Sequence, residues 1–158
     1  MEPLFVLSVT TGAAWRIAKH RGHPHPAVLA LRAGVCAMFL LTGTVHFVGK
    51  REQMVEMVPD QIPFPEQTVT VTGVLELLGA LGLLHRRLAP WSAGGLGLLL
   101  IAMFPANVHL ALHGSDLPWW DRLVPRTVLQ GIFLGAVAGT LGGRRSRGAA
   151  RRVHPSSS

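Results

Sequence analysis

Val69–Leu84 reads VTVTGVLELLGALGLL, an apolar run with one acid, Glu76, near its middle. Three more apolar runs, Ala27–Val48, Leu88–Leu112 and Leu123–Leu141, contain no carboxylate. A helix needs about 20 residues to cross the hydrocarbon core of a bilayer, so each run is close to that length. A charge at bilayer depth costs about 2.5–3.5 kcal/mol on insertion scales, so such residues are usually paired, protonated or functional. The sequence therefore predicts an all-α integral membrane protein, a four-helix transmembrane bundle with Glu76 inside it.

The composition agrees with this class. Of the 158 residues 49% are hydrophobic and 15% are charged, whereas a soluble domain has about 25% charged residues. We expect a four-helix transmembrane domain over residues 27–142, with no room for a separate soluble domain. Residues 1–26 are predicted to be an interfacial or disordered leader, because the apolar run Pro3–Trp15 is too short to span. Residues 143–158, rich in arginine and serine, are predicted to be a disordered basic tail.

The charges are distributed unevenly between the two sides of a four-span topology. One side receives ten basic residues: Arg16, Lys19, Arg21, Arg86, Arg87, Arg144, Arg145, Arg147, Arg151 and Arg152. The other side receives Lys50, Arg51 and Arg122, together with six acids. Short loops rich in Lys and Arg stay cytoplasmic, so we expect both termini inside. An anionic lipid leaflet accounts for the net charge of +7, and no nucleic-acid partner is expected.

A few strongly polar residues fall inside the spans: Arg32, His46, Glu76, Asn107, His109 and Gln130. At 1.5 Å per residue, Arg32 lies about 9 Å from the middle of the first span, and Glu76 lies near the middle of the second. A buried ion pair between Arg32 and Glu76 is therefore within reach, and it would satisfy both charges. Such a pair can simply fasten the two helices together.

His46 lies two residues before the end of the first span, and Asn107 and His109 lie near the end of the third, so all three are predicted at the outer side. Facing inward, they would form a small polar pocket beneath the proline-rich loop Gly49–Gln67. A histidine and an asparagine can bond the two carbonyl oxygens of a quinone. The alternative is that the histidines bond water and headgroups at the interface.

Other ligand sites are not predicted. His109 and His113 are four residues apart, but no acidic or cysteine ligand shares that helix face, so we expect no metal site. Cys36 is the only cysteine, which excludes an intrachain disulfide and a C-x-x-C pair.

The glycines Gly131, Gly135, Gly139 and Gly143 recur every four residues and predict a close helix contact. We favour a contact within the chain over a homo-oligomer through Gly131, Gly135 and Gly139.

Five motifs along the chain carry a resemblance to a known family: Leu31-Arg32-Ala33-Gly34, Gly43-Thr44-Val45-His46-Phe47, Met57-Val58-Pro59 with Pro63 and Pro65, Thr72–Ala80 and Phe104-Pro105-Ala106-Asn107. From Arg32 to Leu141 the chain resembles the DoxX-like family of small bacterial membrane proteins. The resemblance implies a four-helix bundle in the bacterial cytoplasmic membrane. The family takes its name from a small subunit of a thiosulfate:quinone oxidoreductase, and most members have no established activity.

Two functions follow as hypotheses. The first is a non-catalytic or accessory subunit of a quinone-linked membrane redox system, with an oxidoreductase as partner. In that case quinone, and not haem, is the cofactor we expect. The second is a structural scaffold or a small-solute transporter, in which Glu76 is a buried structural or proton-binding carboxylate. We do not expect the chain to be an enzyme on its own.

Overall fold

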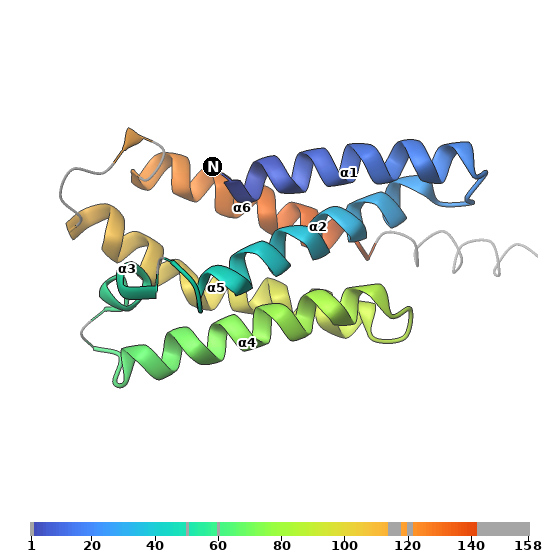
Figure 1. Cartoon of the computed structure of the whole chain (residues 1–158). Coiled ribbons are helices and arrows are strands. Elements are labelled where there is room, and N and C mark those ends of the chain that lie inside the picture. Colours follow the sequence, from blue (N-terminus) through green and yellow to red (C-terminus); the bar gives the residue numbers. More distant parts are fainter. Residues whose placement is uncertain (1, 50, 60, 114–117, 120–121, 142–158) are drawn as a thin grey trace, which may run out of the picture.

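The computed structural model describes residues 2–49, 51–59, 61–113, 118–119 and 122–141, and its regular elements are all helices (Figure 1). In chain order they are α1 (Glu2–His20), α2 (Pro26–Val45), α3 (Arg51–Glu56), α4 (Pro65–Leu84), α5 (Ala89–His113) and α6 (Leu123–Gly139). The predicted all-α class is confirmed for these residues. The expected basic tail lies outside them.

Three helices are long and apolar enough to cross a membrane, Pro26–Val45, Pro65–Leu84 and Ala89–Leu112, with 20, 20 and 24 residues. They correspond to the first three predicted spans. The fourth, α6, is apolar but shorter, at 17 residues. Helix α4 begins four residues before the predicted run, with Pro65 in its first turn. Proline is well tolerated there, because the N–H group that it lacks would have no partner within the helix. The predicted loop between α2 and α4 contains a further short helix, α3, that the sequence pattern does not reveal.

The leader, expected to be interfacial or disordered, contains a helix of 19 residues, α1, packed along α2; its interfacial position stays a prediction. Leu7 belongs to the main hydrophobic core and is 6% exposed. Close packing explains the difference: a Cβ atom at Gly34 of α2 would lie 2.9 Å from the Leu7 carbonyl oxygen and would collide with the Thr11 hydroxyl. The small side chain at position 34 lets the two backbones approach, which hydropathy alone does not reveal.

Helix α2 lies at the centre of the arrangement and packs against α1, α4 and α6. Helix α5 packs against both α4 and α6, so α2, α4, α5 and α6 form a closed ring of contacts with α1 outside it (Figure 1). The glycines of α6 divide between two environments. A Cβ at Gly139 would meet Leu31 of α2 at 2.6 Å, whereas Cβ atoms at Gly131 and Gly135 would meet nothing within 4 Å. The homo-oligomer through these glycines stays a prediction.

The helices turn apolar side chains outward and several polar ones inward. On α4 and α5 the exposed residues include Leu78, Leu81, Leu98 and Ile101, which are 54–69% exposed. The buried residues include Glu76, Gln130 and Thr140. This is the reverse of the usual soluble amphipathic helix, whose polar face points to solvent.

We expect Gly34→Val to lower the free energy of unfolding by about 1–3 kcal/mol, because the added side chain must displace Thr11 or the α1 backbone. The matched control is Gly12→Ala in α1, where a Cβ meets nothing within 4 Å. That change should be neutral or stabilise by up to about 1 kcal/mol. Thermal unfolding of the purified chain in detergent measures both, and equal stability of the two variants would contradict the α1–α2 contact.

Candidate functional site

The contact between α2 and α4 is built around two glycines, one on each helix. A Cβ at Gly43 would lie 2.9 Å from the Leu77 side chain and 3.2 Å from the Glu76 Cβ. A Cβ at Gly73 would lie 2.6 Å from the His46 Cβ. Gly43 therefore lies opposite Leu77 and Glu76, and Gly73 lies opposite His46. This reciprocal arrangement brings the two backbones close enough for short polar side chains to meet.

Glu76 occupies the middle of this contact and is 3% exposed. Its Oε2 atom accepts a hydrogen bond of 2.6 Å from the Thr42 hydroxyl. Position 42 of α2 is therefore level with position 76 of α4. The hydroxyl gives the carboxyl group a partner inside an apolar contact, where an unpaired group would be costly.

His46 lies one residue beyond the end of α2, on the same face as Thr42. Its Nδ1 atom is 2.9 Å from the Thr42 carbonyl oxygen and 4.0 Å from Glu76 Oε2. Burial is the largest influence on the pKa of His46 and lowers it. The bond to Thr42 acts in the opposite direction, and the Arg51 charge lowers the pKa as well. A neutral imidazole that donates Nδ1–H to the Thr42 carbonyl fits this geometry.

Arg51 of α3 closes the site at this end. Its Nη1 donates to the His46 carbonyl oxygen at 3.3 Å, and its Nη2 donates to the Thr70 hydroxyl at 2.9 Å. The same guanidinium thus joins the end of α2 to the first turns of α4. The His46 carbonyl follows the last turn of its helix, where no intrahelical donor is available. Helix α3 is therefore tied to the site through its first residue.

Arg32 does not form the ion pair with Glu76 that the sequence predicts. It donates from Nε and Nη2, each at 3.2 Å, to the Thr140 carbonyl oxygen at the end of α6. The register of the helices is the reason. Thr42 is level with Glu76, and Arg32 is ten residues earlier, which is about 15 Å along the helix axis. A guanidinium at a helix C-terminus also meets free carbonyls and a favourable dipole.

The sequence predicts one pocket of His46, Asn107 and His109, but His46 and Asn107 do not come together in the structure. His46 lies between α2 and α4, whereas Asn107 Oδ1 accepts a 2.6 Å hydrogen bond from Arg126 Nη1 on α6. His109 is half-buried on α5. Gln130 of α6 donates to the Leu100 carbonyl oxygen of α5, five residues before Pro105. His46 and Asn107 thus belong to two different helix contacts, α2 with α4 and α5 with α6.

Among the described residues no group of three or more His, Cys, Asp and Glu side chains could hold a metal ion. The side chain of His113 lies outside the described part. Two residues that matter were missed from the sequence. Thr42 is four residues before His46, a spacing that places both on one helix face. Arg126 is a charged residue inside the fourth apolar run, and a search for arginines in the spans finds it.

A comparison with known families gives one match. Residues 35–138, more than half of the chain, match the family described as a domain of unknown function (DUF8561). The chain belongs to this family. The matched region runs from α2 to α6 and leaves α1 outside it. No curated protein and no solved structure matches the chain.

We expect Thr42→Val and Glu76→Gln to be coupled in a double-mutant cycle. Thr42→Val should cost about 1–2 kcal/mol in detergent, because it removes the hydroxyl that Glu76 accepts from. Thr44→Val is the matched control, because the Thr44 hydroxyl is on an exposed residue and bonds only within its own helix. Arg32→Leu and Glu76→Gln should add within about 0.5 kcal/mol. Strong coupling of Arg32 with Glu76, and none of Thr42 with Glu76, would contradict this site.

Proposed function

We propose that this protein is an integral membrane protein. The observation that supports this proposal is that apolar side chains face outward while polar side chains are buried. In α4 and α5 the leucines and isoleucines that face outward are more exposed than a soluble protein leaves them in such numbers. In lipid the same surface is at no disadvantage, and each polar group must then be satisfied inside the protein. The hydrogen bonds of Thr42, Arg126 and Gln130 between helices meet that requirement.

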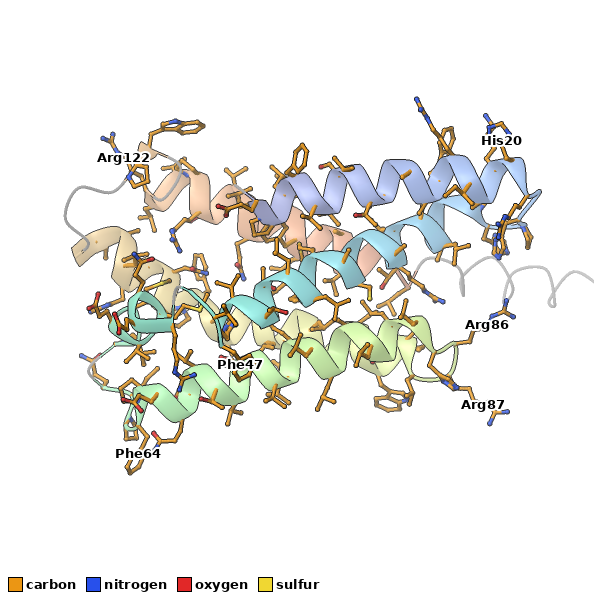
Figure 2. All side chains as sticks on the ribbon, viewed as in Figure 1. His20, Phe47, Phe64, Arg86, Arg87 and Arg122 are labelled. Carbon is orange, nitrogen blue, oxygen red and sulfur yellow. The ribbon has the colours of Figure 1, made fainter. Side chains whose placement is uncertain are left out.

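The orientation we propose follows from the charges at the two ends. His20, Arg86 and Arg87 lie at one end of the long helices, and Phe64 and Arg122 lie at the other (Figure 2). The end with Arg86 and Arg87 is the cytoplasmic one under the positive-inside rule. Helix α6 ends on this side, since its Thr140 carbonyl bonds Arg32 in the first half of α2. The C-terminus is then cytoplasmic, as the sequence suggested.

Helix α1 changes the expected position of the N-terminus. It runs antiparallel to α2 and packs along it with Leu7 and Ala18 buried, so a bilayer that contains α2 also surrounds α1 (Figure 1). Its first residues then lie at the outer side, beside the end of α2. Under this proposal the chain crosses the membrane five times, with the N-terminus outside. The basic residues Arg16 and Lys19 stay at the cytoplasmic end, where the positive-inside rule favours them.

The role we propose is that of a structural or accessory membrane subunit. Supporting it, Arg32, Gln130 and Arg126 each donate a hydrogen bond to a neighbouring helix. Between α2 and α4, the Thr42 hydroxyl donates to Glu76. Such bonds hold helices together in lipid, where apolar contacts alone give little preference for protein over lipid. The more specific form of the proposal is an accessory subunit of a quinone-linked redox system in a bacterial cytoplasmic membrane, which the resemblance to the DoxX-like family supports.

Cysteine labelling in intact cells tests the orientation. In a Cys36→Ala background, an impermeant thiol reagent should label Gln61→Cys and Glu2→Cys from outside, and His85→Cys only after the cells are opened. All three residues are exposed: Gln61 in the loop before Phe64, Glu2 at the start of α1, and His85 next to Arg86, which lies at the opposite end from Phe64. Labelling of His85→Cys in intact cells would contradict the orientation. Protection of Glu2→Cys alone would contradict the crossing of α1.

Purification in a mild detergent tests the redox partner. If the protein serves a quinone-linked system, quinone or an oxidoreductase should accompany it at close to equal stoichiometry, as measured by extraction with mass spectrometry. Loss of the bound quinone in His46→Ala, with retention in the control Thr44→Val, would tie binding to the α2–α4 site. A pure, ligand-free protein that no oxidoreductase accompanies would contradict the redox form and leave the membrane proposal intact.

A further inference from the structure

The Thr42 hydroxyl lies between two acceptors. Its Oγ1 atom is 2.6 Å from Glu76 Oε2 on α4 and 3.4 Å from the Phe39 carbonyl oxygen on its own helix. A hydroxyl has one hydrogen to donate and can accept through its lone pairs. It can therefore donate to the Phe39 carbonyl while it accepts from Glu76 when that carboxyl group carries a proton.

This geometry suits Glu76 in both of its protonation states. When Glu76 is ionised, Thr42 donates its hydrogen to the carboxylate. When Glu76 is protonated, its O–H donates to Thr42 Oγ1, and the Thr42 hydrogen turns to the Phe39 carbonyl. The change needs the rotation of one hydroxyl hydrogen and no displacement of a helix. A carboxyl group with a purely structural role needs a partner in only one state.

The surrounding charges leave Glu76 free to change state. The helices packed against α4 are α2, α3 and α5. Their titratable or charged residues, within the described ranges, are Arg32, Cys36, His46, Arg51, Glu52, Glu56, His109 and His113. Of the basic side chains that the structure describes, only His46 comes within 4.0 Å of the carboxyl group. Arg32 is bonded to Thr140, and Arg51 to His46 and Thr70, so neither guanidinium holds Glu76 ionised.

We propose that Glu76 is a reversible proton-binding site served by His46 from the α3 end of the protein. A proton taken up at His46 Nε2 gives an imidazolium, which releases its Nδ1 proton to Glu76 Oε2. His46 is then neutral with its hydrogen on Nε2, and Glu76 is a neutral acid bonded to Thr42. A rotation of the imidazole closes the 4.0 Å between Nδ1 and Oε2. Chains of Glu and His at membrane depth are a common means of moving protons. The proposal goes beyond an accessory role, since it assigns ligand binding to this chain alone.

Infrared difference spectroscopy on the full chain in lipid nanodiscs tests the site. Between about pH 5 and pH 9, the wild type should gain the C=O stretching band of a protonated carboxyl as the pH falls. The band should be absent in Glu76→Gln and unchanged in Glu66→Gln, which removes an exposed carboxyl from the same helix. Absence of the band in the wild type, or its persistence in Glu76→Gln, would overturn the proposal.

Two further variants keep Glu76 and cover the case in which Glu76→Gln does not fold. Thr42→Val deprives the ionised carboxylate of its donor, so the band should persist to a pH about 1–2 units higher, while Thr44→Val leaves it unchanged. His46→Phe should slow the appearance of the band after a pH jump by about tenfold or more, because the relay is removed. An unshifted band in Thr42→Val overturns the two-state hydrogen bond, and an unchanged rate in His46→Phe overturns the relay. Both results are independent of the labelling that tests the membrane topology.

Discussion

The burial of one carboxyl group between two helices determines how the rest of the molecule is arranged. Glu76 must have a hydrogen-bond partner inside an apolar contact, and Thr42 is the residue that provides it. A threonine is short, so the backbones of α2 and α4 have to come close. Gly43 and Gly73 allow this, one on each side of the contact. The hydrogen bond and the glycines together fix the register of α2 against α4, and this register sets the level of each other residue along the pair.

The difference between local sequence pattern and helix register explains which predictions from the sequence hold. The apolar runs predicted α2, α4, α5 and α6 to within a few residues, because hydropathy is a local property that one sequence carries in full. The burial of Glu76 could be predicted for the same reason, because it follows from the apolar run around it. The partner of Glu76 could not be predicted, because the relative shift of two helices depends on packing between distant segments. Arg32, the predicted partner of Glu76, and Thr42, the observed one, are ten residues apart along α2. In place of the predicted ion pair, Glu76 therefore accepts a hydrogen bond from Thr42.

Helix α1 was missed for a related reason. Its sequence mixes leucine and valine with threonine, glycine and charged residues, so it is too polar for a span by composition alone. It packs because Gly34 of α2 leaves space for Thr11 and the Leu7 backbone. Complementary shape of this kind has no signature in one segment taken by itself. The polar groups at its C-terminal end, where Lys19 lies over the Trp15 ring, suit a helix end at an interface.

Two of the helix contacts differ in the chemistry of their polar groups, and this difference bears on function. Between α5 and α6, Arg126 bonds Asn107 and Gln130 bonds a backbone carbonyl, so a permanent charge and an amide supply the donors. Between α2 and α4 the donors and acceptors are a hydroxyl, an imidazole and a carboxyl group, two of which can titrate. A contact that only had to fasten two helices could use the first chemistry on both sides. The use of titratable groups at the central helix, beneath the α3 end, is what a proton-binding role requires.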